Sequence, residues 1–184
     1  MRPSHTDDPS WGPASRDSAP PPSILSPPLR REVPGLELVP DGLVAVQERL
    51  STVADGAEDP LPDIAAHLVG SGGKRVRPLV LLLAAEACDS RGAHPVPLAA
   101  AAELLHTSTL LHDDVVDEAE TRRGKPAAHA IWGNPLAVLA GDYCMACALI
   151  VIADVGDPRP VRTLAETLQR MAEGEVIQLR SRDR

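Results

Sequence analysis

At 184 residues, the chain is long enough for one domain with a sizeable core. Its formal net charge of −8 argues against a nucleic-acid-binding protein, which normally carries a basic face. The chain has no Phe and one Tyr, and its body is rich in Ala, Leu and Val, which favours an all-α fold over a β-sandwich.

The first 40 residues differ from the rest in composition. They hold ten of the 19 prolines and few apolar residues, and no helical or alternating period persists there. We therefore expect a disordered, proline-rich extension over residues 1–40 and a helical domain over residues 41–184. The three cysteines are an odd number in a chain without a secretory apolar segment, which predicts reduced thiols and a cytoplasmic location.

Short helices are expected in the first part of the helical domain. Residues 43–53 have amphipathic spacing, and Asp63 is a candidate N-cap for a helix that ends at Gly70. After the joint at residues 71–73, Pro78 is placed for the first turn of a helix over residues 77–87. The interior of that helix is apolar all round, so we expect it to be buried.

Longer helices are expected after a connector over residues 89–97. Residues 98–117 contain neither Pro nor Gly and predict one long helix, which is followed by a basic turn over residues 121–125. Asn134-Pro135 opens a helix through the apolar run 137–155, and a last helix covers residues 161–179. Because Gly141 and Asp142 interrupt the apolar run and no basic flank follows it, we predict a buried core helix and no transmembrane segment.

The long helix carries two contrasting stripes. Residues at offsets of four, seven and eleven form a mainly polar stripe: His106, Leu110, Asp113 and Asp117. The opposite stripe is mainly apolar: Leu104, Ser108, Leu111 and Val115. We expect the apolar stripe to pack on the core and the polar stripe to face a cavity, with Asp114 as a flanking group.

Asp113 and Asp117 lie one helical turn apart, so their carboxylates repel each other. A cation would relieve this repulsion. Mg²⁺ fits best, because it takes one or two carboxylates and completes its octahedron with waters and phosphate oxygens. The alternative interpretation is a solvated, acidic helix end.

Two clusters of cations lie near these carboxylates in the sequence. Lys74, Arg75 and Arg77 follow two glycines, and Arg122 and Arg123 come just after the carboxylates. Arginine forks and lysine ammonium groups suit diphosphates, so the clusters indicate two anionic groups with Mg²⁺ between them. Solvated basic turns are the alternative for either cluster alone.

Several ordered motifs now identify a resemblance. They are Gly72-Gly73-Lys74-Arg75-Val76-Arg77-Pro78, Glu103-Leu104-Leu105-His106, His112-Asp113-Asp114-Val115-Val116-Asp117, Arg122-Arg123-Gly124-Lys125-Pro126, Ala140-Gly141-Asp142-Tyr143 and Glu173-Gly174-Glu175. In order and spacing the chain resembles the polyprenyl diphosphate synthases, which are trans-prenyltransferases of the isoprenoid synthase fold. The resemblance covers about residues 43–182.

This resemblance implies a reaction and a role for each site residue. An allylic diphosphate ionises, the double bond of isopentenyl diphosphate attacks the carbocation, and a proton is lost. By position, Asp113 and Asp117 would ligate Mg²⁺ on the allylic diphosphate, and Arg122 would bind that diphosphate. The residues implied to hold isopentenyl diphosphate are Lys74, Arg77, His106 and Arg123.

The family's second aspartate-rich helix has no counterpart before Arg184. We therefore expect a partial synthase domain with little activity by itself, completed by further chain or by a complementary partner. A non-catalytic homologue that binds diphosphates, or regulates a full-length synthase by dimerisation, is the second hypothesis. A third is a metal-dependent phosphohydrolase built on His112 and Asp113, but the other histidines are not spaced as partners.

Overall fold

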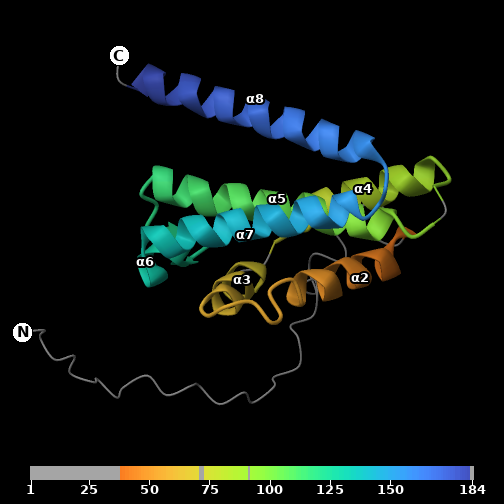
Figure 1. Ribbon diagram of the computed structural model, residues 1–184, viewed down its shortest axis with the longest axis horizontal. Coiled ribbons are helices and arrows are strands. Elements are labelled where there is room, and N and C mark those ends of the chain that lie inside the picture. Colours follow the sequence, from red (N-terminus) through yellow and green to blue (C-terminus); the bar gives the residue numbers. More distant parts are fainter. Residues whose placement is uncertain (1–37, 71–72, 91, 183–184) are drawn as a thin grey trace, which may run out of the picture.

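The computed structural model describes residues 38–70, 73–90 and 92–182, and the expected extension over residues 1–40 lies almost wholly outside them. The described chain is helical, apart from one two-stranded hairpin, which confirms the all-α prediction (Figure 1). The helices are α2 (Pro40–Ser51), α3 (Leu61–Val69), α4 (Val76–Ala87), α5 (Pro95–Val116), α6 (Ala128–Trp132), α7 (Asn134–Ala153) and α8 (Pro158–Arg182). Strands β1 (Thr121–Arg122) and β2 (Lys125–Pro126) pair antiparallel between α5 and α6.

Helices α5 and α7 lie side by side at the centre of the molecule, with α2 and α3 on one side and α8 on the other (Figure 1). The main core joins α2, α4, α5 and α7 through side chains such as Leu50, Leu82, Leu104 and Ile152. Burying each of these side chains contributes about 1.5–3 kcal/mol. A second buried cluster, which includes Ile64 and Leu111, lies at the hairpin end of α5.

Several helix starts differ from the sequence prediction. Helix α2 begins at Pro40, α5 at Pro95 and α8 at Pro158, each three residues earlier than expected. The first-turn N–H groups of a helix have no partner within the helix, so proline is tolerated there and does not mark a connector. Asp63 lies in the first turn of α3, whose N-cap residue is Pro60, so the N-cap prediction is wrong. In that first turn the helix dipole still stabilises the Asp63 carboxylate.

The basic turn is the tip of the hairpin. Arg123 and Gly124 have φ values of 52° and 77°, the left-handed pair that a tight two-residue hairpin loop needs. Thr121 pairs with Pro126 and Arg122 with Lys125. The hairpin therefore holds Arg122 and Arg123 on a short, fixed loop directly after α5.

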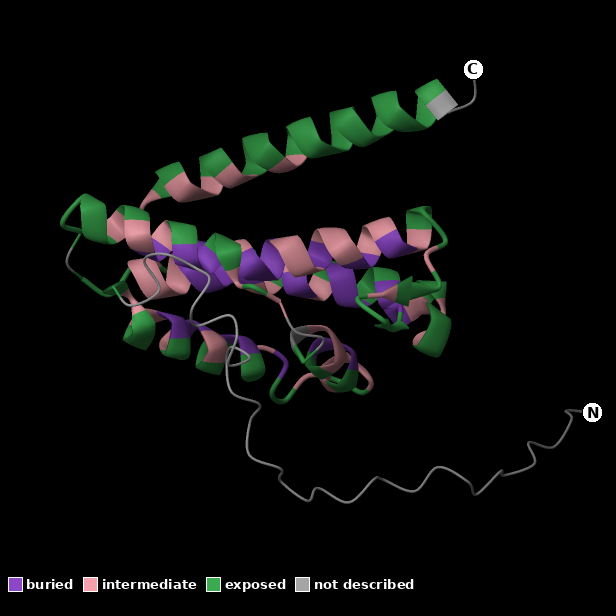
Figure 2. Cartoon of the chain, turned by 180° about the vertical axis from the view of Figure 1, so that it is seen from behind, coloured by how far each residue is buried: buried purple, intermediate pink, exposed green. Residues whose placement is uncertain are grey.

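Two helices expected to be buried are buried on one face only (Figure 2). On α4, Val76 and Val80 remain 50% and 59% exposed, so the prediction of burial all round is wrong. On α7, Ala140 and Ala148 pack inward, while Leu139 and Ile150 are 58% and 60% exposed. Within the described residues α7 is long and apolar enough to cross a membrane by length and composition, with a third of its apolar window buried in this fold.

Helix α8 packs on the rest of the molecule near its start. Val161, Leu164 and Leu168 contact the core, whereas the second half of the helix is exposed. Figure 1 shows α8 diverging from α5 and α7 toward its C-terminal end.

Candidate functional site

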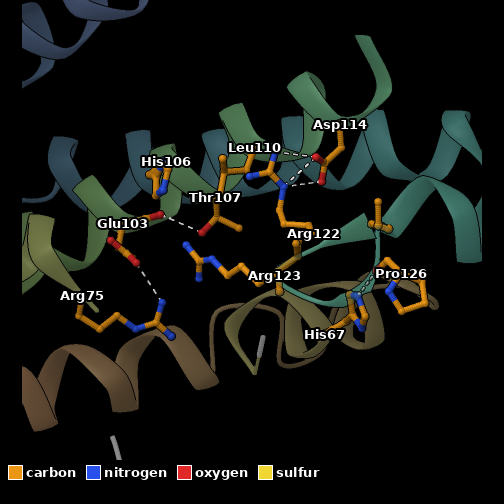
Figure 3. Close-up of a pocket in the computed structure, with 13 residues that line it drawn as sticks. His67, Arg75, Glu103, His106, Thr107, Leu110, Asp114, Arg122, Arg123 and Pro126 are labelled. Atoms are coloured by element: carbon orange, nitrogen blue, oxygen red, sulfur yellow. Dashed lines mark hydrogen bonds and ion pairs between the residues drawn. The ribbon is translucent and has the colours of Figure 1, made fainter. Parts of the chain in front are cut away.

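A small pocket, partly open to solvent, lies beside the polar stripe of α5 (Figure 3). Its polar lining comes from α3, the start of α4, α5 and the hairpin: His67, Arg75, Glu103, His106, Thr107, Asp114, Arg122 and Arg123. Leu68, Leu110 and the segment 126–128 complete the wall. The α5 stripe predicted to face a cavity therefore does so through His106 and Leu110, and the apolar stripe packs inward as expected.

Asp114 and Arg122 form the strongest ion pair of the pocket. The Asp114 carboxylate is 1% exposed, and Arg122 Nε donates to both of its oxygens at 2.7 Å. Arg122 Nη2 lies 2.5 Å from Oδ1. The hydrogen bond to Asp114 raises the pKa of Arg122 above its usual value. Asp114 therefore holds the hairpin against α5 and fixes the Arg122 guanidinium.

Asp113 and Asp117 lie at the C-terminal end of α5 and do not line the pocket. Partial burial raises the pKa of Asp113, and the carboxylates of Glu175, Asp117 and Asp114 raise it further, against the effect of Arg122. Negative charge is thus in excess around Asp113, and such a site favours a cation.

Asp113 and Asp117 fit the predicted Mg²⁺ as a pair of carboxylate ligands. In the described part of the chain, no three His, Cys, Asp or Glu side chains group as a complete metal site. Mg²⁺ needs no such group, because it is commonly bound by one or two carboxylates plus waters and substrate phosphates. The donor set is therefore chemically suited to a metal that arrives with a diphosphate.

Three of the predicted cations lie near His106. Burial lowers the pKa of His106, and so do the charges of Arg77, Arg123 and Arg122, while Glu103 opposes them. Arg122 and Arg123 line the pocket with His106, whereas Lys74 and Arg77 are exposed and outside its lining. The fold thus brings together cations from two segments that are some 45 residues apart in the sequence.

Arg75 and Glu103 are a second buried pair, which the sequence prediction missed. Arg75 Nη1 lies 2.9 Å from Glu103 Oε1, and Arg75 Nε donates to Gln47 Oε1 on α2 at 3.2 Å. The sequence prediction groups Arg75 with the ligand-binding cations. A lone glutamate among apolar residues, one turn before His106, was the available signal for the pair.

His112 points away from the pocket, toward α7. Its Nε2 atom lies 3.2 Å from the Val138 carbonyl oxygen and 3.3 Å from Asp142 Oδ1. A Cβ atom on Gly141 would lie 2.4 Å from the same nitrogen, so only glycine allows this approach. The hydrolase hypothesis required His112 to act with Asp113, and the structure contradicts it.

The pocket wall opposite α5 is tied down by His67 and Lys125. His67 Nε2 lies 3.0 Å from the Pro126 carbonyl oxygen, and its ring meets that of Trp132 edge to face. Lys125 Nζ donates to the Gly70 carbonyl oxygen at 3.2 Å. These contacts link the hairpin to α3.

Comparison with known proteins gives consistent matches. The sequence model of the polyprenyl synthetase family matches residues 58–184. The chain is 40% identical over 144 residues to heptaprenyl diphosphate synthase component 2 of Geobacillus stearothermophilus, covering 78% of this chain and 45% of that protein. It is 44% identical over 113 residues to octaprenyl diphosphate synthase of Escherichia coli, covering 61% and 35%.

Solved structures agree with these sequence matches. A polyprenyl synthase from Caulobacter crescentus, complexed with calcium and isoprenyl diphosphate, has a TM-score of 0.76 and 40% identity, over 78% of this chain and 44% of that one. A decaprenyl diphosphate synthase from Rhodobacter capsulatus has a TM-score of 0.77 and 40% identity, over 83% and 46%. The chain thus spans less than half the length of these relatives.

Proposed function

This chain belongs to the polyprenyl synthetase family, and from that premise we propose that it takes part in elongating an allylic diphosphate with isopentenyl diphosphate. One observation carries the proposal: Asp113 and Asp117 lie one helical turn apart at the end of α5, beside Asp114, which lines a pocket together with His106, Arg122 and Arg123. The carboxylates suit an anionic substrate that arrives with a divalent metal. The cations suit a second anion that binds without a metal.

The proposed reaction breaks a C–O bond and a C–H bond and forms a C–C bond. The C–O bond of the allylic diphosphate breaks, and the diphosphate leaves with the electron pair. The double bond of isopentenyl diphosphate then attacks the allylic carbon and the C–C bond forms, after which a neighbouring C–H bond breaks to give a new double bond and its proton passes to the departed diphosphate or to water. Catalysis therefore depends on stabilising the charge that develops on the leaving diphosphate.

In our assignment Asp113 and Asp117 hold Mg²⁺ and Arg122 binds the allylic diphosphate. When bound, Mg²⁺ would neutralise charge on the leaving diphosphate. Arg122 is suited to its role because Asp114 fixes its Nε and Nη2, which orients the guanidinium beside Asp113 and Asp117. An oriented donor stabilises developing charge without reorganising during the reaction.

The diphosphate of isopentenyl diphosphate is assigned to a group of side chains that contains no carboxylate. Lys74, Arg77, His106 and Arg123 would bind the diphosphate of isopentenyl diphosphate. The support for this group is electrostatic: Arg77 and Arg123 are close enough to lower the pKa of His106. An incoming anion would relieve this concentration of positive charge.

We also propose that the working enzyme is an assembly in which further protein covers α7. The exposed apolar side chains Leu139 and Ile150 support this, because a large exposed apolar patch typically marks an interaction surface. One relative is by name component 2 of a synthase, which is consistent with pairing of chains in the family.

Calorimetric binding and elongation assays test the function together. The purified protein is titrated with geranyl diphosphate and with isopentenyl diphosphate, with and without Mg²⁺, beside Asp113→Ala and the distant exposed control Asp154→Ala. We expect Mg²⁺-dependent binding of geranyl diphosphate that Asp113→Ala abolishes and Asp154→Ala leaves intact.

Labelled isopentenyl diphosphate then reports whether elongation follows binding. Elongation lost in Asp113→Ala would support the synthase, and binding without elongation would favour the diphosphate-binding homologue. If neither diphosphate binds the wild-type protein, the proposal is wrong.

A further inference from the structure

Arg75 is turned inward, although it stands between two exposed cations. Its side chain is 10% exposed and that of Glu103 is 7% exposed, and the two are joined at 2.9 Å. Arg75 also bonds Gln47 on α2. One guanidinium therefore ties the start of α4 to both α2 and α5, while its neighbours Lys74 and Arg77 stay on the surface.

The backbone at Arg75 is unusual. Arg75 precedes the first residue of α4 with φ 46° and ψ 38°, in the left-handed region that residues with a Cβ rarely adopt. Such a conformation persists only where the surroundings hold it in place. The bonds to Glu103 and Gln47 are among the side-chain contacts of Arg75 that hold this turn.

The turn also meets the hairpin. A Cβ on Gly73 would lie 2.8 Å from Arg123 Nη1 and 3.5 Å from Arg75 Nη1, so both guanidinium groups lie against the Gly73 backbone. Figure 3 shows Arg123 extending between the Arg75–Glu103 pair and Arg122. The position of residues 73–75 therefore also limits where Arg123 can lie.

We propose that Glu103 is a positioning residue for isopentenyl diphosphate: through Arg75 it fixes residues 73–77, so that Lys74 and Arg77 face the same ligand as His106 and Arg123. The inference rests on the proposed function and deepens it. Arg122 is held separately, by Asp114. Each of the two diphosphates then depends on a different buried carboxylate of α5.

This division predicts a selective defect. In Glu103→Gln, Arg75 loses its charged partner and residues 73–77 loosen, while the Asp114–Arg122 pair is untouched. Binding of isopentenyl diphosphate should weaken about tenfold or more, because a displacement of about 1 Å in the groups that position a ligand has an effect of at least this size. Binding of geranyl diphosphate with Mg²⁺ should stay within about twofold, since the bonds that orient Arg122 run to Asp114 and not to Glu103 or Arg75.

Three further variants complete the experiment. Arg75→Lys keeps the charge but cannot reach both Glu103 and Gln47, so it tests the same contact if Glu103→Gln folds poorly. Asp114→Asn should show the reverse selectivity: it should weaken the binding of geranyl diphosphate more than the binding of isopentenyl diphosphate. Glu166→Gln removes one member of the exposed Arg162–Glu166 pair on α8 and should leave the binding of both ligands unchanged.

Hydrogen exchange at the Leu79 amide, which donates to the Arg75 carbonyl oxygen at 3.0 Å, gives a readout that needs no ligand. In Glu103→Gln or Arg75→Lys this amide should exchange faster, while those of α7 stay protected. Equal weakening of the binding of both diphosphates, or unchanged exchange at Leu79, would overturn the positioning role. If wild-type protein binds neither diphosphate but the exchange changes as expected, the proposed function fails while the anchoring of this segment stands.

Discussion

Two buried carboxylates of α5, Glu103 and Asp114, lie on either side of His106 in the sequence, and each is neutralised by an arginine from another element. Such pairs add little net stability, because the gain in attraction is offset by desolvation, but breaking one leaves a buried charge without compensation. At the scale of single residues, some of the basic side chains around the pocket therefore have two roles: they stabilise the fold by pairing with buried carboxylates, and they bind the ligand.

The Asp114–Arg122 pair can be tested through stability. Asp114→Asn should lower the free energy of unfolding by about 2–3 kcal/mol, toward the low end for buried pairs because the Arg122 side chain is 29% exposed. Urea unfolding measures this loss. The matched control is Asp113→Asn, which removes a repelled carboxylate and should change stability by less than about 0.5 kcal/mol. Equal effects of the two changes would contradict the assignment.

The lowered pKa of His106 predicts a pH dependence. Because the pKa in the folded protein lies below the ordinary value of 6.5, the unfolded chain takes up a proton first as the pH falls. The contribution of His106 to stability is thus fully present above pH 6.5 and is lost as the pH falls through the lowered pKa. A bound diphosphate should raise this pKa, since an anion favours the charged imidazole.

NMR titration of the histidine rings measures the His106 pKa directly, with His106→Gln to assign its signal. We expect a midpoint below 6.5 in the free protein and an upward shift when isopentenyl diphosphate is added. An unchanged midpoint on adding saturating isopentenyl diphosphate would show that His106 is not part of the binding site.

The α5–α7 contact dominates at the scale of elements. Small inward residues, among them Ala137, Ala140 and Ala148, let the two helices approach closely. Gly141 continues this row and accommodates the His112 ring, which reaches Val138 and Asp142. The Gly-Asp motif that resembles the synthase family therefore has a packing reason, and it keeps the acidic end of α5 in place on α7.

Gly141→Ala should destabilise the protein by about 1–3 kcal/mol, because its Cβ would overlap the His112 ring. Gly174→Ala is the control, since Gly174 is also helical and has nothing within 4 Å of its Cβ position. That control should leave stability unchanged or raise it by up to about 1 kcal/mol. Thermal unfolding compares the two.

Adding His112→Ala to Gly141→Ala checks the cause of this destabilisation. The double variant should lose less stability than the sum of the two single changes, because the overlap disappears with the ring. Strict additivity would show that Gly141 matters for some other reason.

The whole molecule presents apolar side chains on several helices. In the described part of the chain, the exposed ones include Val80 on α4, Leu139 and Ile150 on α7, and Val176 and Ile177 on α8. On the apolar helix α7 the exposed large side chains form two pairs, Val138 with Leu139 and Leu149 with Ile150. A surface of this kind promotes association.

We therefore expect the 184-residue chain to self-associate in a concentration-dependent way, with an apparent mass above 19.4 kDa. The double change Leu139→Glu and Ile150→Glu should shift it toward monomer, because charges on this face oppose apolar contact. Arg170→Glu on the exposed side of α8 controls for added negative charge. Sedimentation analysis that finds a monomer at all concentrations would contradict the prediction.

The presence and order of the helices, the basic turn after α5 and the two stripes of α5 could be predicted from the sequence, because periodicity and the placement of Pro and Gly are local properties. The family could also be identified, since its motifs are short and ordered along the chain. Among the side chains, Asp113, Asp117, His106 and the cations were found as chemical types at suitable spacings. Each of these inferences uses only neighbours in the sequence.

Only the tertiary structure decided which of those charged side chains pair with each other and which remain to bind a ligand. Whether an arginine binds a ligand or a buried carboxylate depends on partners far away in the sequence: Arg75 meets Glu103, 28 residues on, and His112 meets Val138, 26 residues on. Burial of α4 and α7 was overestimated for the same reason, because an apolar pattern does not state which face another element will cover. Pairing and coverage are long-range properties, and they are fixed only when the helices pack.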